Sequence, residues 1–142
     1  MFSDTIIDSP TIQAYRETAY HVHGETPACL RIDFHSPELA EIHQAYQTDC
    51  SLFITAFNPF GEILDEATNI ARQQDLANEL KRRSLIFIEG IGQHPCNQHP
   101  GEPSFLVLGI KLEAAKKLGV KYRQNAIIWS GSDAVPRLIL LR

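Results

Sequence analysis

Three side chains that can bind a soft metal ion lie within six residues of the sequence, at His94, Cys96 and His99. Zinc is held in proteins by these residue types. A closed structural site needs a further ligand, and no separate Cys-x-x-Cys or His-x-x-x-His pattern is present to supply it. We therefore expect an exposed polar loop here, and we predict no metal site and no cofactor. Cys96 beside a histidine could also act as a nucleophile, an alternative that the sequence leaves open.

Two carboxylates, Glu89 and Glu102, could act as general acid and base, or could hold a divalent ion for hydrolysis. Lys121 and Arg123 would then bind the anionic part of a phosphate ester. This chemistry requires the two carboxylates to lie within a few ångströms of each other in the fold. Single carboxylates at strand ends and in loops are also ordinary, so a metal-dependent hydrolase acting on phosphate esters is an alternative hypothesis.

A third group of side chains carries amides, a hydroxyl and a carboxylate, all of which form hydrogen bonds with polar ligands. Its members are Asn58, Asn69, Glu102, Ser104, Gln124 and Asn125. Amides and hydroxyls recognise patterns of donors and acceptors but transfer protons poorly, so this set favours ligand binding over catalysis. Structural roles are the competing explanation, because Asn58 precedes a proline at a strand end and Gln124 can hydrogen-bond loop backbone.

The elements that must position these residues follow from the spacing of apolar residues. Ser9-Pro10 and Ser36-Pro37 are typical of a helix N-cap followed by a proline in the first turn. Gly119 is expected to end the last helix as its C′ residue. The predicted helices span 10–19, 37–47, 65–83 and 111–119, the predicted strands span 28–34, 51–58, 84–90, 104–110, 125–129 and 137–141, and residues 91–103 are predicted to be a loop.

From residue 51 to residue 129 the predicted order is β-α-β-β-α-β, the pattern of a ferredoxin-like split β-α-β fold. We therefore expect an α+β fold with a ferredoxin-like core, N-terminal helices and strand, and a C-terminal strand. The strands at 51–58 and 104–110 would be central, which agrees with their apolar residues on both faces. In this arrangement Asn58, the loop 91–103 and residues 124–125 meet at one end. Another mixed α/β sandwich is the alternative.

The composition is that of an ordinary globular protein, with 44% hydrophobic and 21% charged residues among 142. We expect a single domain, residues 1–142, and no membrane contact, because no apolar run approaches the length of a membrane span. The N-terminus lacks signal-peptide features, and three widely spaced cysteines imply no disulfide framework. A soluble, cytoplasmic protein is therefore expected.

The net charge of −4 is distributed unevenly along the chain. Residues 1–71 contain 11 acidic and 2 basic residues, whereas residues 72–142 contain 6 acidic and 11 basic residues. Two solvated faces explain this division, but a basic patch for a small anionic or polar ligand, or a self-complementary surface in a homodimer, would also produce it. The overall acidity disfavours non-specific nucleic-acid binding.

Three sequence blocks occur together and in order, namely Phe53-Ile-Thr-Ala-Phe-Asn-Pro59, Ser104-Phe-Leu-Val-Leu-Gly-Ile110 and Gln124-Asn-Ala-Ile-Ile-Trp129. With them the chain resembles an uncharacterised bacterial family, the domain-of-unknown-function family numbered thirty-two ninety-three. The resemblance extends from the region of Tyr20 to the C-terminal strand. It implies an asparagine in the long helix, matched by Asn69, and a glycine-containing loop before an acidic-Ser-Phe segment, matched by Glu102 and Ser104. Pro103 replaces a second acid of the family, and Gln73 stands where a second asparagine is usual.

This resemblance implies no activity, so a function must be inferred from the residues. The first hypothesis is a non-enzymatic module that binds a small ligand or a partner and has a regulatory role. The hydrolase is one alternative, and a protein-interaction or assembly subunit is another. Whether the protein is an enzyme, and which ligand or partner it binds, stay open.

Overall fold

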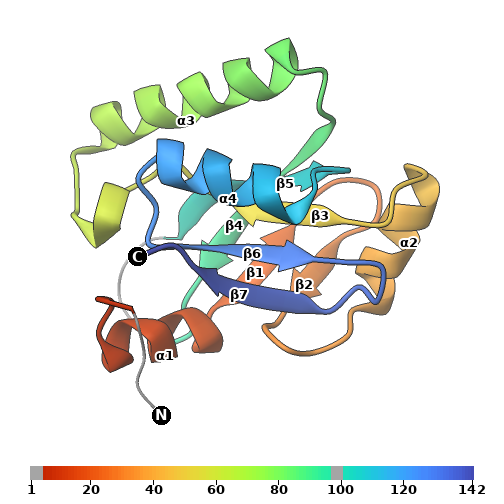
Figure 1. The fold of residues 1–142 in the computed structure, drawn as a ribbon, viewed down its shortest axis with the longest axis horizontal. Helices are drawn as coiled ribbons and strands as arrows, with labels where there is room; N and C mark the ends of the chain where they lie inside the picture. The colour runs from red at the N-terminus through yellow and green to blue at the C-terminus, as the bar shows by residue number, and fades with distance from the viewer. Residues whose placement is uncertain (1–4, 97–100) are drawn as a thin grey trace.

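A sheet of seven antiparallel strands forms the centre of the computed structural model, which describes residues 5–96 and 101–142. In spatial order these strands are β2 (Ala28–Leu30), β1 (Ala19–Val22), β4 (Phe87–Gln93), β5 (Glu102–Leu108), β3 (Ser51–Ile54), β6 (Ala126–Ser130) and β7 (Pro136–Leu140). The α-helices among the described residues are α1 (Ser9–Glu17), α2 (Pro37–Ala45), α3 (Glu66–Arg82) and α4 (Leu112–Lys121), and a short 3-10 helix spans Pro59–Gly61. The mixed α+β class expected from the sequence is confirmed (Figure 1).

The sheet is larger than the core expected from the sequence. β3 and β5 pair with each other and each has a further neighbour, so their predicted central position is confirmed. The β1–β2 hairpin extends the sheet beyond β4, and β7 extends it beyond β6. β1 lies where the sequence predicted the end of a helix and then no element. Its four residues are too few to establish an alternating pattern, although Tyr20 and Val22 are buried.

Two hydrophobic clusters cover the two faces of the sheet. Leu52 of β3 belongs to the cluster that includes Leu80 of α3 and Leu118 of α4. The next residue, Phe53, belongs to the other cluster, which includes Ile42 of α2. Consecutive strand residues point to opposite faces, so β3 is apolar on both sides. In Figure 1, α3 and α4 lie next to each other over the first of these faces.

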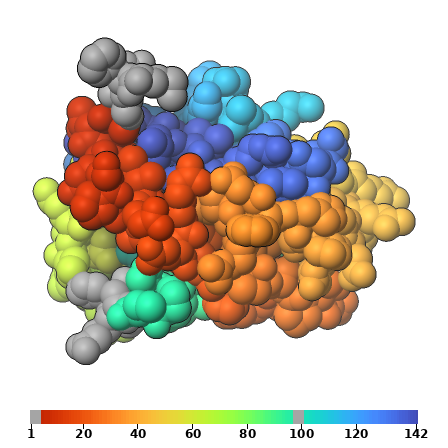
Figure 2. All heavy atoms as spheres, turned by 90° about the horizontal axis from the view of Figure 1, so that it is seen from below, coloured from red at the N-terminus to blue at the C-terminus, as the bar shows by residue number. Residues whose placement is uncertain are grey.

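The sheet curls, and the segment after β2 reaches the start of β7. The Asp33 N–H donates to the Pro136 carbonyl at 2.7 Å, and the Ser36 N–H donates to the Ala134 carbonyl at 2.9 Å. Figure 2 shows the same contact, with the orange N-terminal segment against the blue C-terminal strand. These hydrogen bonds occupy backbone groups near both edges of the sheet. Without them, those groups would be free to pair with a strand of another chain.

α1 and α2 both begin with a side-chain N-cap followed by a proline in the first turn, as predicted, but the N-cap of α1 is one residue earlier than expected. Ser36 caps α2, because its Oγ accepts a hydrogen bond from the Leu39 N–H at 3.1 Å. The cap of α1 is Asp8 and not Ser9, since Asp8 Oδ1 accepts from the Thr11 N–H at 3.0 Å.

The prediction that Gly119 ends the last helix is wrong. α4 continues through Gly119 to Lys121, and Arg123 has the left-handed backbone conformation, with φ of 57°. Gly119 is buried against the neighbouring strands, where a Cβ atom would lie 2.8 Å from Ile127 Cγ2 and 2.5 Å from Leu141 Cδ1. A glycine is therefore needed for close helix–sheet packing and not for the helix end.

Several strand boundaries also differ from the prediction. β2 ends at Leu30 instead of continuing to residue 34, and β5 spans Glu102–Leu108 instead of 104–110. β3 ends at Ile54, and residues 55–58 form the start of a loop instead of continuing the strand. β4 occupies 87–93 in place of the predicted 84–90, because its later residues pair with β1, with Tyr20 opposite Gly92. The predicted loop 91–103 is consequently shorter, since residues 91–93 and 102–103 lie in strands.

Candidate functional site

The loop at residues 55–61, which follows β3, is held by side chains of α3. The Ala56 N–H donates to Gln73 Oε1 at 2.8 Å, and the Ala56 carbonyl accepts from Arg72 Nε at 2.8 Å. The Asn58 N–H donates to Asn69 Oδ1 at 2.8 Å. Asn69, Arg72 and Gln73 are three and four residues apart, so they project from one face of the helix. This face fixes the backbone of the loop.

Asn58 is the centre of a polar network that contains three of the predicted site residues. Its Oδ1 accepts from the Leu64 N–H at 3.0 Å and from Asn69 Nδ2 at 2.8 Å. Its Nδ2 donates to Glu102 Oε2 at 2.8 Å. The amide orientation is fixed by these partners, and Asn58 has a left-handed backbone with φ of 48°. Burial raises the pKa of Glu102, an effect that the hydrogen bond from Asn58 partly opposes.

The other three predicted residues lie close by, and their side chains also form hydrogen bonds within the protein. Gln124 Nε2 donates to the Phe57 carbonyl at 3.2 Å, so it holds the same loop. Asn125 Nδ2 donates to the Tyr15 hydroxyl at 3.1 Å. Ser104 Oγ donates to the Glu102 carbonyl at 2.9 Å. Asn58, Glu102 at the start of β5 and residues 124–125 thus lie at one end of the fold, as predicted, but their donors and acceptors are mostly satisfied within the protein.

Two residues that sequence reasoning missed complete this end, Tyr15 of α1 and Arg142. Arg142 Nη1 donates to Asn125 Oδ1 at 3.1 Å, and its guanidinium lies 4.1 Å from the ring centre of Phe60. Burial raises the pKa of Tyr15, the Asn125 amide opposes this, and the nearby Glu102 charge adds to it. Nothing in the spacing pointed to these two, because they approach from opposite ends of the chain. Arg72, by contrast, was detectable from its helical spacing to Asn69.

The two carboxylates of the hydrolase hypothesis lie on opposite faces of the sheet. Glu89 is opposite Phe105, which packs in the cluster under α3 and α4. Glu102 is opposite Gly92, three positions further along β4 and hence on the other face. Lys121, which was expected to bind the anion with them, is paired with Glu79 instead, at 2.7 Å. The paired-carboxylate condition is therefore not met by Glu89 and Glu102.

The His94–Cys96 segment shows no metal site in the described part of the chain. His94 Nε2 lies 3.1 Å from Glu17 Oε2, and its Nδ1 accepts from the Cys96 N–H at 3.1 Å. His99, the third predicted ligand, lies outside the described residues. Within 5–96 and 101–142, no group of three or more His, Cys, Asp or Glu side chains could hold a metal ion.

A cleft of about 490 Å³ opens between α3 and the strands β4 and β5, next to the loop 55–61. We call it the α3–β4 cleft. Its lining residues are His23, Phe57, Ile70, Gln73, Gln74, Ala77, Lys81, Phe87, Glu89, Gly90, Ile91, Pro103, Ser104 and Phe105. Among the described residues, Gln73 Nε2 is the buried side-chain nitrogen or oxygen without a hydrogen-bond partner. Flipping the amide would not help, because Gln73 Oε1 is needed by the Ala56 N–H.

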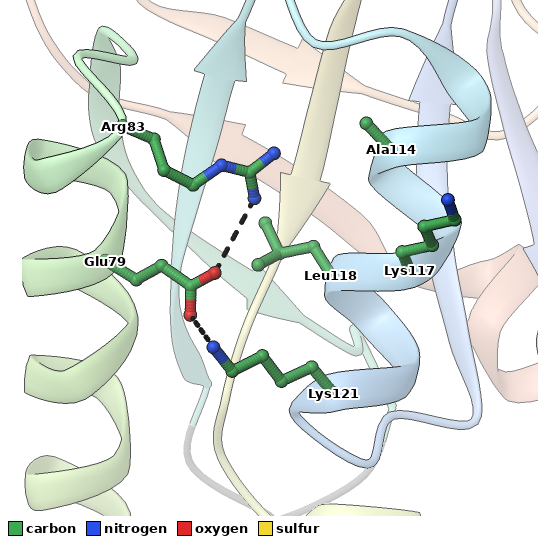
Figure 3. Close-up of a pocket in the computed structure, with 6 residues that line it drawn as sticks. All are labelled: Glu79, Arg83, Ala114, Lys117, Leu118 and Lys121. Atoms are coloured by element: carbon green, nitrogen blue, oxygen red, sulfur yellow. Dashed lines mark ion pairs between the residues drawn. The ribbon is translucent and has the colours of Figure 1, made fainter.

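A second cleft, of about 380 Å³, lies between α3 and α4, and we call it the α3–α4 cleft. Its lining residues are Glu79, Arg83, Ala114, Lys117, Leu118 and Lys121. In Figure 3, Glu79 reaches between the helices toward both Arg83 and Lys121. Tyr122 also donates its hydroxyl to Glu79 Oε1, at 2.8 Å. Burial and this bond to a carboxylate raise the pKa of Tyr122 to about 12.

Among the helices of the described residues, none combines the length and the apolar character that a membrane crossing requires. Comparison with curated proteins finds no match, and comparison with solved structures finds none either. The sequence model of a family described as a protein of unknown function, DUF3293, matches residues 54–127. The match includes the loop 55–61, α3 and all six predicted site residues, whereas Tyr20, Tyr15 and Arg142 lie outside it. Because the match covers more than half of its length, the chain belongs to the DUF3293 family.

Proposed function

We propose that this protein is a non-enzymatic module that binds a small ligand in the α3–β4 cleft. The observation that carries the proposal is the amide nitrogen of Gln73, which is buried without a hydrogen-bond partner among the described residues and belongs to a residue that lines the cleft. A buried donor without a partner costs about 1–3 kcal/mol. A ligand that offers an acceptor to Gln73 Nε2 would recover part of this free energy. The ligand class is therefore an apolar molecule that carries a hydrogen-bond acceptor.

The lining of the cleft supports an apolar ligand. Phe57, Phe87 and Phe105 contribute aromatic rings, and Phe87 packs edge-on against Phe105 with ring centres 4.8 Å apart. Ile70 also lines the cleft and is 54% exposed, although it is a large apolar side chain. Small-molecule sites are mostly apolar, have a few polar groups, and enclose roughly 300–1,000 Å³. The α3–β4 cleft falls within that range.

The six polar residues predicted from the sequence have a supporting role in this proposal. Ser104 lines the cleft directly. Gln124 holds the Phe57 carbonyl and Asn69 holds the Asn58 N–H, so the two fix the loop that places Phe57 in the wall. Direct ligand contacts by Asn58, Glu102 or Asn125 stay a prediction.

The finer description of the fold belongs to the same proposal. The order β4-β5-β3-β6 supports a ferredoxin-like core, because the first and third of its four strands are central and all neighbours are antiparallel. The hairpin of β1 and β2 and the strand β7 would then be additions to that core. A bacterial origin and a cytoplasmic location stay predictions from the sequence.

Two nearly isosteric probes test the proposal, acetophenone, which has a carbonyl acceptor, and ethylbenzene, which has none. Titration followed by ¹H–¹⁵N NMR should show saturable shifts along α3 and β4 with both, and acetophenone should bind about threefold to tenfold more tightly because one hydrogen bond is gained. Equal affinities would contradict the role of Gln73. An absence of shifts with both probes would contradict the site itself.

A pair of exposed isoleucines supplies the matched variants. Ile70→Asn changes the lining of the cleft, whereas Ile63→Asn changes a side chain that is 73% exposed and not part of the lining. Ile70→Asn should weaken binding of both probes, and Ile63→Asn should leave it unchanged. If both variants weaken binding equally, the probes associate with exposed apolar surface in general.

A further inference from the structure

The positive charge of the chain is concentrated on one helical layer. Residues 66–83 and 111–123, which contain α3 and α4, carry nine basic and four acidic residues in a protein of net charge −4. The layer is therefore basic although the protein as a whole is acidic. Such a local excess attracts anions when the cations face a common space.

Three of these cations line the α3–α4 cleft. Arg83 at the end of α3 and Lys121 of α4 both extend toward Glu79, whereas Lys117 extends from the preceding turn of α4 with its ammonium turned away from Glu79 (Figure 3). Glu79 is the acidic residue in the lining, so the cations outnumber it three to one. Lys117 forms no ion pair with any described residue. The cleft thus has positive charge that internal pairing does not neutralise.

Glu79 is placed to orient the cations. Its side chain is only 10% exposed, its Oε1 lies 2.7 Å from Lys121 Nζ, and its Oε2 lies 3.6 Å from Arg83 Nη1. Burial would raise the pKa of Glu79, but hydrogen bonds from Lys121 and Tyr122 outweigh it and leave the pKa lowered. The ionised carboxylate therefore holds two cations on opposite sides of one space.

We propose that the α3–α4 cleft binds the phosphate group of a small molecule between Arg83, Lys117 and Lys121. A phosphate group offers several acceptor oxygens, so it can bind more than one cation at the same time. Its charge of nearly −2 matches the excess of cations over Glu79. Leu118 and Ala114 supply an apolar floor, and the volume of about 380 Å³ limits the bound molecule to a small one. This site is separate from the α3–β4 cleft and does not depend on the ligand proposed there.

Calorimetric titration with inorganic pyrophosphate, at constant ionic strength, tests the proposal with two adjacent lysines. Lys117→Gln removes a cation from the cleft, and Lys116→Gln removes one from the same helix at a residue that does not line the cleft and pairs with Glu113. Lys117→Gln should weaken binding about threefold to fivefold, and Lys116→Gln should change it less than about twofold. Equal weakening by both variants, or no saturable binding by the unaltered protein, would overturn the proposal.

Glu79→Gln separates positioning from simple attraction. If the carboxylate orients Lys121 and Arg83, its loss should weaken pyrophosphate binding even though the cleft becomes more positive. Tighter binding by Glu79→Gln would overturn the positioning role. Thermal unfolding of each variant shows whether the fold is retained, and the lysine pair remains decisive if Glu79→Gln does not fold. An oligonucleotide serves as a second probe. If Lys116→Gln and Lys117→Gln weaken its binding equally, the helices form a general surface for polyanions and not a phosphate site.

Discussion

At the scale of the single residue, Glu102 is half-buried and has one side-chain donor among the described residues, Asn58 Nδ2. Its raised pKa means that the folded protein binds the proton more tightly than the unfolded chain, whose value is about 4.5. Stability from this group is therefore greatest at acidic pH and falls as the pH rises through the folded pKa. Above that pH the fold contains a poorly solvated carboxylate.

We predict that Glu102→Gln stabilises the protein at about pH 8 and that this gain shrinks toward about pH 4. The glutamine oxygen can still accept from Asn58 Nδ2, and no charge is buried. Urea unfolding of the variant and the unaltered protein at both pH values measures the difference. A variant that is less stable than the unaltered protein at about pH 8 would show that the ionised carboxylate makes favourable contacts that the structure does not contain.

The Asn69 side chain forms two hydrogen bonds with Asn58 and one with the Leu64 carbonyl, and Asn69 is only 4% exposed. Asn69→Ala leaves the Asn58 N–H without a partner, and we expect a loss of about 1–3 kcal/mol in the free energy of unfolding. Asn78→Ala is the matched control on the same helix, because Asn78 is exposed and bonds only Gln74 among the described residues. The control should change stability by less than about 0.5 kcal/mol. Similar losses in both variants would mean that helix propensity, and not the loop contact, decides the result.

At the scale of the element, the sequence predicts what is local and misses what depends on distant neighbours. The Ser36 cap, the extent of α3 and the central position of β3 and β5 follow from residues that are close together in the chain. β1 and the role of Gly119 do not, because β1 depends on pairing with β4 and Gly119 lies against Ile127 and Leu141. The site divides in the same way. Asn58 and Asn69 are 11 residues apart and were grouped correctly, whereas the Tyr15–Asn125 contact spans 110 residues.

Gly119 offers a prediction that runs against helix propensity. Gly→Ala within a helix normally stabilises it by roughly 0.5–1 kcal/mol. Here the new methyl group would overlap with Leu141 and Ile127, so Gly119→Ala should reduce the free energy of unfolding by about 1–3 kcal/mol. In a Leu141→Ala background part of this penalty should disappear, because one of the two obstructing side chains is gone. Denaturant unfolding of the four proteins measures the coupling, and additive losses would contradict the packing explanation.

At the scale of the whole molecule, the two helical layers are joined to the sheet by different chemistry. α3 and α4 pack on one face through an apolar cluster, and the ion pair between Glu79 and Lys121 joins the two helices to each other. α2 contributes Ile42 to the cluster on the other face and also a buried polar contact, in which His43 Nε2 lies 2.8 Å from Ser51 Oγ of β3. Protonation of His43 would place a charge inside this second layer. The attachment of α2 to the sheet should therefore depend on pH.

The direction of this pH dependence follows from the lowered pKa of His43. Burial lowers the pKa of His43, an effect that the charge of Asp49 partly opposes, so the unfolded chain takes up a proton first, at about 6.5. The stability that the neutral imidazole contributes is present above that value and is lost as the pH falls below it. The contribution of His43 to the free energy of unfolding should therefore decrease from about pH 8 to about pH 5.5, and His43→Gln should remove this contribution to the slope. His35→Gln, at an exposed histidine that contacts the Asp133 carbonyl, is the matched control and should keep the slope. An unchanged slope in His43→Gln would show that α2 stays attached to the sheet independently of the histidine charge.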